Sequence, residues 1–152
     1  MKNILNEKDR KEVLQRIQNI SMESSRLWGK MNANEMLCHS ADQIRLALGE
    51  KSSLFVGNAF LTTFFKTLVL WGVPAPKGKV ETVKELKQGA EGTPVTSFSS
   101  DKESLIDSIE KFVTKTPDNM NVVHPAFGNL SYKQWGRLIY IHLDHHLKQF
   151  SS

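Results

Sequence analysis

The sequence predicts an all-α protein, and three observations support this fold class. Apolar residues recur every three or four positions in several stretches, which is the period of one helix face. Three segments begin with a capping box, in which Ser or Asn is followed three residues later by Glu or Gln. The sequence offers no convincing pair of strand-like runs. Its 152 residues suit a single domain, residues 1–152, with one core.

The first two helices are expected to start at asparagine caps. Asn6 precedes the first helix. Asn32 precedes the second, where Glu35 completes a capping box. Gly49 ends the second helix, because glycine readily adopts the left-handed conformation found at helix C-termini. The residues expected to face the core are Val13, Ile17 and Ile20 in the first helix and Leu37, Ala41, Ile44 and Leu48 in the second.

A third helix is expected over Leu54–Trp71, within an apolar run that is long enough to span a bilayer. Lys66 lies past the middle of this run, where insertion into a membrane would cost roughly 2.5–3.5 kcal/mol. Asn58, Thr62 and Lys66 recur every four residues and form a narrow polar stripe. We therefore expect a helix that is buried in the protein or in a homodimer interface. Contact with a membrane is the less favoured alternative.

The segment from Gly72 to Ser99 has the composition of a loop, with one short helix near Val80–Lys87. A connection of this length usually has a functional or covering role. Ser100 and Glu103 form the capping box of the next helix. Its apolar face consists of Leu105, Ile106, Ile109, Phe112 and Val113.

The loop Thr116–Asn129 precedes the last helix, which has a capping box at Ser131 and Gln134 and continues to about Gln149. This order of elements predicts a four-helix bundle with a long crossover that contains the extra apolar helix.

Composition narrows the function classes. The net charge is +4, but basic and acidic residues alternate, as in Lys8–Glu12, and no nucleic-acid-binding motif occurs. We therefore expect no nucleic-acid partner. Cys38 is the single cysteine, which excludes an internal disulfide and fits a reducing compartment. The N-terminus lacks the features of a secretory signal. These observations predict a cytoplasmic protein.

Three histidines predict a metal site. His142 and His146 are four residues apart, so they lie on one face of the last helix and can bind one ion. His39 on the second helix is the candidate third ligand. His39 lies ~10 Å from the start of its helix, His142 lies ~16 Å from the start of the last helix, and each helix is ~24–27 Å long. His39 and His142 therefore lie at the same height along the helix pair if the two helices pack antiparallel. Alternatively, the pair His142 and His146 would only complement the helix dipole.

Other candidates carry more ordinary explanations. His145 is adjacent to the pair and is expected behind the ligands or toward solvent. His124 precedes a proline, which favours a role in a turn. Glu35 lies one turn before His39 and could orient that ring, but its capping role already explains it. Cys38 neighbours His39, but adjacent helix positions point about 100° apart, so we interpret it as a small buried residue.

Two sequence blocks resemble the DinB-like (DinB/YfiT-type) metalloenzyme superfamily. One is W-G-x-M-x-x-x-x-M-L-x-H, seen as Trp28 through His39, and the other is the ending "HPAFGNLSYKQWGRLIYIHLDHHLKQF". Within the superfamily, the chain is most similar to a domain-of-unknown-function branch. The resemblance implies an up-down-down-up four-helix bundle. It also implies a histidine triad in which His39, His142 and His146 bind the metal.

The resemblance implies a metal-dependent enzyme, a thiol-dependent transferase or a hydrolase that acts on a small molecule. A low-molecular-weight thiol would be its partner. The alternative is a non-catalytic metal-binding or stress-response and interaction module of the same fold. Zn, Ni, Fe and Mn all accept imidazole, so the sequence does not identify the divalent ion.

Overall fold

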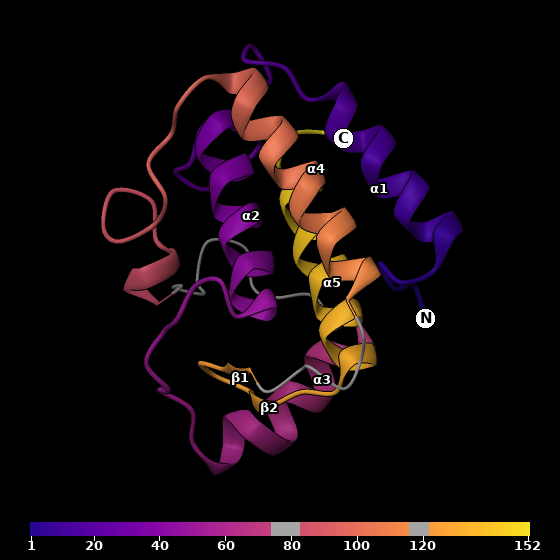
Figure 1. Cartoon of the computed structure of the whole chain (residues 1–152), viewed down its shortest axis with the longest axis vertical. Helices are drawn as coiled ribbons and strands as arrows, with labels where there is room; N and C mark the ends of the chain where they lie inside the picture. The colour runs from indigo at the N-terminus through magenta and orange to yellow at the C-terminus, as the bar shows by residue number, and fades with distance from the viewer. Residues whose placement is uncertain (74–82, 116–121) are drawn as a thin grey trace.

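The computed structural model describes residues 1–73, 83–115 and 122–152, and within them the chain is mostly helical (Figure 1). This part of the chain contains five α-helices, a π-helical turn, a 3-10 turn and a two-stranded hairpin. The expected helical class is confirmed, whereas the hairpin departs from it. The helices are α1 (Glu7–Asn19), α2 (Ala33–Leu48), α3 (Lys66–Trp71), α4 (Phe98–Thr114) and α5 (Tyr132–Gln149).

Capping chemistry places the ends of α2 and α5 where the sequence predicts them. Asn32 Oδ1 accepts from the Glu35 amide at 2.9 Å, and the Glu35 carboxylate accepts from the Asn32 amide at 2.8 Å. Ser131 and Gln134 form the same reciprocal pair before α5. Gly49 ends α2 with a φ of 77°. Each cap satisfies amides or carbonyls that the helix itself leaves unpaired.

The start of α4 differs from the sequence prediction. The helix begins at Phe98, with Ser97 as its N-cap accepting from the Ser100 amide, so the expected capping box at Ser100 and Glu103 is wrong. The reason lies in Asp101, whose carboxylate accepts from the Thr96 amide at 2.8 Å and the Thr96 hydroxyl at 2.7 Å. These bonds secure the chain before the helix and place its first turn three residues earlier.

The apolar helix is shorter and more exposed than expected. Residues 54–58 have no regular secondary structure, and the helical conformation begins at Ala59. A π-helical turn over Leu61–Phe65 precedes α3. Neither the turn nor α3 contains a buried residue, so the expectation that this helix is packed on most sides within the protein is wrong.

The long connection and the loop before α5 each contain short structure. A 3-10 turn over Lys84–Leu86 lies in the region expected as a short helix, Val80–Lys87, of which residues 80–82 lie outside the described residues. Strands β1 (Val123–His124) and β2 (Gly128–Asn129) pair antiparallel. Strands of two residues are too short to show the alternation from which strands are predicted.

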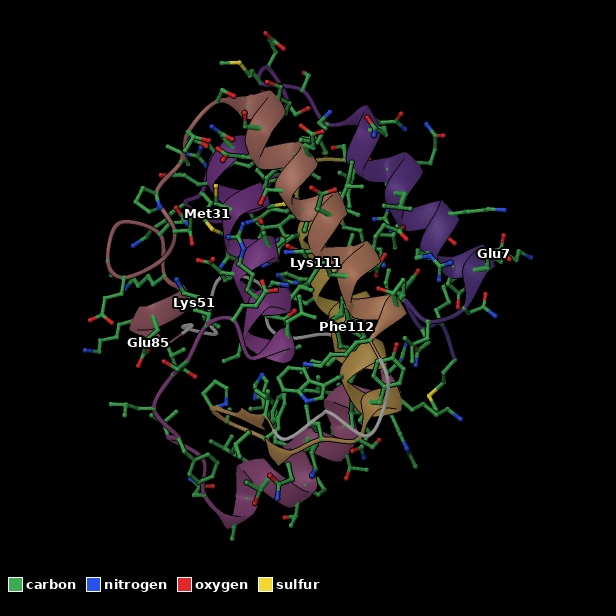
Figure 2. All side chains as sticks on the ribbon, in the orientation of Figure 1. Glu7, Met31, Lys51, Glu85, Lys111 and Phe112 are labelled. Carbon is green, nitrogen blue, oxygen red and sulfur yellow. The ribbon has the colours of Figure 1, made fainter. Side chains whose placement is uncertain are left out.

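The long helices surround one apolar core. Helix α2 packs against α4 and α5, α1 against α5 and α4, and α3 against α5. Figure 1 shows α5 running opposite to α2, and the Gln149 amide, at the end of α5, donates to the Trp28 carbonyl just before α2. Side chains fill the interior (Figure 2). No helix in the described residues is both long and apolar enough to cross a membrane.

Candidate metal centre

Three histidine side chains meet between α2 and α5. His39 comes from α2, and His142 and His146 come from successive turns of α5. Their ring centroids are 4.9, 4.9 and 4.5 Å apart. One nitrogen from each ring lies within 4.8 Å of the others, which is close enough for all three to hold one metal ion. The structure thus brings together the three residues that the sequence singled out.

The closest approach in this cluster joins His39 Nε2 to His142 Nε2, at 3.1 Å. Two imidazole nitrogens that bind one zinc ion lie 2.0–2.1 Å from it, so this separation corresponds to an angle of about 100° at the ion. That value lies between the octahedral and tetrahedral angles. The spacing therefore fits two neighbouring ligands of a divalent ion.

The outer nitrogen of His39 is held by the long connection. Nδ1 lies 2.8 Å from the carbonyl oxygen of Leu86, a buried residue at the end of the 3-10 turn. A carbonyl only accepts, so Nδ1 carries the proton in the neutral ring. The lone pair is then on Nε2, which faces the cluster. Metal-binding histidines commonly have such a partner behind the ring.

His146 is oriented in the same way by a side chain. Its Nδ1 lies 3.0 Å from Gln149 Oε1, and the Gln149 amide nitrogen donates to the Trp28 carbonyl at 2.6 Å. The second bond fixes which end of the amide faces His146 and makes Nδ1 the donor. Gly29 leaves room for this arrangement, because a Cβ there would lie 2.1 Å from the Gln149 nitrogen. The segment Trp28-Gly29 therefore supports the ring from behind.

His142 completes the cluster without such a partner. Its Nδ1 is buried and has no hydrogen-bond partner among the described residues. Its ring is held by packing against the other two histidines.

Burial keeps all three rings neutral. It lowers the pKa of His39 and, together with the neighbouring histidines, lowers the pKa of His142 well below its usual range. Burial and His39 lower the pKa of His146 to about 3. Neutral imidazole is the form that binds metals. The environment therefore favours the protonation state that a metal site requires.

The other sequence candidates lie outside the three-histidine group. His145 packs edge-on to Trp28 and His146, with ring centroids 6.0 and 5.2 Å apart. Glu35 caps α2. Cys38 is buried, and burial together with Asp101 raises the pKa of its thiol to about 12, which suppresses the reactive thiolate.

His124 belongs to the hairpin. Its Nδ1 accepts from the amides of Ala126 and Phe127, and its ring stacks on Phe127 at 4.6 Å. With Nδ1 accepting, the ring proton lies on Nε2. These bonds confirm the turn role expected for this residue.

Sequence reasoning missed the two groups that orient the rings. Gln149 stands three residues after His146, a spacing that places both side chains on one helix face, so this signal was present in the sequence. Leu86 acts through its backbone carbonyl, which carries no sequence signature. Its role depends on how the long connection folds over α2.

The fold and the histidine cluster together define a mostly helical protein with three buried or half-buried imidazoles that can hold one metal ion. The chain belongs to the family described as protein of unknown function (DUF1569), whose model matches residues 2–152. No curated protein and no solved structure gives a significant match.

Proposed function

We propose that this protein is a metal-dependent enzyme whose divalent ion is held by His39, His142 and His146. The main observation that supports this proposal is the orientation of the rings. Two of them direct Nδ1–H outward to protein acceptors, and both Nε2 lone pairs are then left facing the cluster. In the metal-free protein His142 Nε2, 3.1 Å from His39 Nε2, can share a proton with that lone pair, and an ion would take the proton's place between the two rings. Rings oriented from behind in this way are the arrangement expected of metal ligands.

Three neutral ligands favour a catalytic site over a purely structural one. Structural zinc sites usually have four protein ligands, whereas catalytic sites have three and leave a position for water or substrate. A divalent ion bound here would act as a Lewis acid, lowering the pKa of a coordinated water or thiol. The chain's own contribution is twofold: burial holds the imidazoles neutral, and Leu86 and Gln149 hold two of them in place.

The reaction class is proposed from the resemblance to DinB-like proteins. The resemblance supports a thiol-dependent transferase, or a hydrolase, that acts on a small molecule. It also supports assigning α1, α2, α4 and α5 to an up-down-down-up bundle, with which the opposed directions of α2 and α5 agree. The hydrogen bond between Gln149 and the Trp28 carbonyl brings the two sequence blocks of this resemblance into contact at the end of α5.

Metal analysis of protein purified without a histidine tag tests the site. We expect about one divalent ion per chain, and we expect the double variant His39→Ala/His142→Ala to lose it, because removing ligands removes most of the affinity. His145→Ala is the matched control, since it removes a neighbouring imidazole on the same helix but none of the three ligands. Full metal occupancy in the double variant would refute the site.

A screen of small thiols with electrophilic compounds tests the reaction. Consumption of free thiol should require the metal-loaded protein and should stop in the double variant, while His145→Ala retains it. Metal bound at full occupancy without turnover of any thiol or ester would favour the non-catalytic metal-binding alternative.

A further inference from the structure

The helical stretch Ala59–Trp71 turns large apolar side chains toward solvent. Phe60 and Phe64 are each 57% exposed, and Trp71 is 72% exposed. Phe60 and Phe64 contact each other, with ring centroids 5.5 Å apart. Exposed apolar residues just before the helical stretch add to this surface. We call the set the aromatic face, and it consists of Leu54, Phe55, Val56, Phe60, Phe64 and Trp71.

Thr62 and Lys66 of the polar stripe are half-buried and lie on the side of the hairpin, whereas Asn58 is exposed. The Thr62 hydroxyl donates to the Asn58 carbonyl, and Lys66 Nζ reaches the carbonyl of Asn129 in β2 at 3.3 Å. Phe65 packs against Phe127, with ring centroids 6.1 Å apart. The hairpin therefore holds the opposite side of the helix, and the aromatic face cannot turn inward without breaking these contacts.

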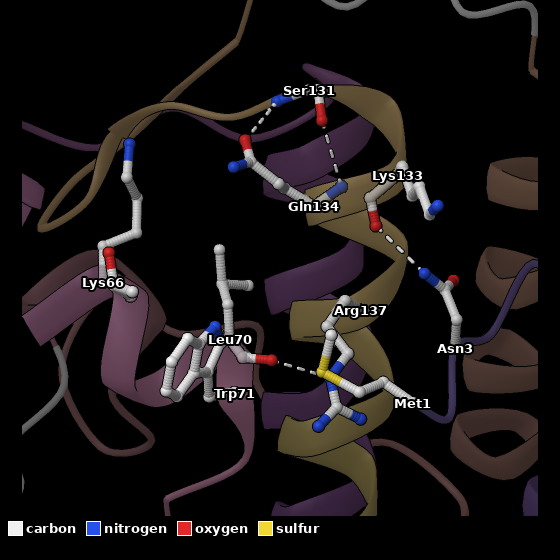
Figure 3. A pocket seen from close by; sticks show the side chains of 10 residues that line it. Met1, Asn3, Lys66, Leu70, Trp71, Ser131, Lys133, Gln134 and Arg137 are labelled. Carbon is white, nitrogen blue, oxygen red and sulfur yellow. Dashed lines mark hydrogen bonds between the residues drawn. The ribbon is translucent and has the colours of Figure 1, made fainter.

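A cationic pocket adjoins the aromatic face. It lies between α3 and α5, has a volume of about 320 Å³, and contains Leu70 and Trp71 beside Lys66, Lys133 and Arg137 (Figure 3). The polar contacts of Arg137 and Lys66 go to backbone carbonyls. Arg137 donates to the carbonyls of Leu70 and Lys2, and Lys66 donates to that of Asn129.

None of the three cations forms an ion pair within the described part of the chain. Residues 51–73 and 130–143, which supply most of this surface, contain no Asp or Glu. The carboxylates beside it come from other segments and accept from backbone amides: Asp9 accepts from that of Asn3, which lines the pocket, and Glu85 accepts from that of Leu54. The pocket thus combines the exposed ring of Trp71 with three cations that form no ion pair with the described residues.

From this juxtaposition we infer that the aromatic face and the cationic pocket bind the surface of an anionic lipid membrane. Aromatic rings favour the membrane interface, and basic side chains beside them attract anionic headgroups. A second copy of the chain fits less well. A symmetric dimer through this face would enclose the cations of both copies in one interface, with no carboxylate of residues 51–73 or 130–143 to pair with them. The binding is peripheral, through partial insertion of the rings.

Flotation with vesicles tests this binding. The metal-loaded full chain is mixed with vesicles of phosphatidylcholine alone, or of equal parts phosphatidylcholine and phosphatidylglycerol. We expect binding to the anionic vesicles, little binding to the neutral ones, and release as salt rises from about 0.1 M to about 1 M, where the Debye length falls from ~10 to ~3 Å.

Two pairs of variants assign the binding to the surface. Phe64→Ser/Trp71→Ser should weaken it about tenfold or more, because the lost rings no longer leave water. Leu27→Ser is its control, since Leu27 is 64% exposed but its amide bonds to Gln149, at the far end of α5. Lys133→Gln should weaken binding about fivefold, corresponding to ~1 kcal/mol per cation near an anionic surface. Lys148→Gln is the charge-matched control on the same helix.

Three outcomes would overturn the inference: no vesicle binding, equal binding to neutral and anionic vesicles, or equal effects of the controls and the test variants. Analytical sedimentation of the unmodified chain tests the competing explanation, in which the aromatic face is a dimer interface. A dimer at micromolar concentration that Phe64→Ser/Trp71→Ser dissociates would identify a second copy as the occupant. Unchanged circular dichroism and metal content in all variants show that the substitutions act at the surface.

Discussion

At the scale of single residues, the candidate centre depends on hydrogen bonds behind the rings as much as on the rings themselves. His39 and His146 each have one nitrogen committed to an oxygen acceptor, so the tautomer of each ring is fixed before any ion binds. Burial then keeps the rings neutral near neutral pH. Most of the conformational entropy of the ligand side chains is therefore already lost when the protein folds, which favours tight binding of an ion.

His124 provides a test of the same electrostatics away from the cluster. Burial lowers the pKa of His124 to about 4, whereas the unfolded chain has a value near 6.5. As the pH falls, the His124 ring is protonated in the unfolded chain before it is protonated in the folded protein. The contribution of His124 to the free energy of unfolding is therefore highest above pH 6.5 and decreases as the pH falls toward 4. From pH 7 to pH 5 this loss is roughly 1–2 kcal/mol, reduced by partial exposure of the residue.

The variant His124→Asn isolates this effect, because Asn keeps an acceptor near the position of Nδ1 but does not titrate. In metal-free protein, wild type should be more stable at pH 7, where the ring still stacks on Phe127. The difference in the free energy of unfolding should narrow by the same roughly 1–2 kcal/mol at pH 5. Denaturant titrations at the two pH values measure it. A difference that does not change with pH would show that His124 titrates normally in the folded protein.

Residue spacing predicted which histidines meet but not what holds them. The four-residue separation of His142 and His146 and the depth of His39 along its helix predicted that the three rings meet once antiparallel packing, which the resemblance implied, was assumed. The Leu86 acceptor could be recognised only from the folded path of the connection, and the orientation of the Gln149 acceptor only from the turn at Gly29 that makes room for it. Backbone carbonyls in particular cannot be distinguished in a sequence.

At the scale of elements, the connection before α4 is fastened to α2 by one buried carboxylate. Asp42 is fully buried and accepts from the Thr93 amide at 2.7 Å and the Thr93 hydroxyl at 2.6 Å. Arg45 and Lys51 lie 3.0 and 3.3 Å from its oxygens. The same connection contains Leu86, whose carbonyl orients His39. Asp42 therefore links the path of the connection to the geometry of the candidate metal centre.

We expect Asp42→Ala to lower the free energy of unfolding by about 2–4 kcal/mol, because it leaves Arg45 and the Thr93 amide without their buried acceptor. Metal affinity should fall up to roughly tenfold as Leu86 loses its fixed position. Denaturant unfolding and competition with a metal-binding dye measure the two effects. Asp107→Ala, an exposed carboxylate on α4, should change stability by less than about 0.5 kcal/mol. Equal stability of Asp42→Ala and wild type would contradict the fastening role.

Helix ends were predictable wherever side chains alone cap them, as at Asn32 and Ser131. The prediction failed at Ser100, where the adjacent serines offer several caps and the bonds of Asp101 to Thr96, five residues earlier, decide between them. It also failed for the orientation of the helical stretch before Trp71. There Lys66 of the polar stripe bonds to the carbonyl of Asn129 in the hairpin, a contact that the sequence does not reveal.

At the scale of the whole molecule, the core does not depend on the histidines. Its largest fully buried side chains come from α1, α2, α4 and α5 and from the segments that flank them; Ile17, Leu37, Phe112, Trp135 and Ile139 are among these. The antiparallel packing of α2 and α5 agrees with the level match deduced from helix rise alone. Core burial of this extent stabilises the helices without any contribution from an ion.

Removal of the metal should therefore abolish turnover while leaving most of the helix content in place. A bound ion stabilises the folded state by mass action, about 2.7 kcal/mol when its free concentration is a hundred times Kd, so chelation should lower Tm but not unfold the chain at room temperature. Far-UV circular dichroism before and after chelation measures helicity, and a thermal scan of the same samples measures the loss of stability. His39→Ala/His142→Ala without chelator provides the control, since its spectrum should match that of the metal-free wild type. In a structural site binding energy is folding energy, so a collapse of helicity on chelation would show that the three histidines serve the fold rather than a reaction.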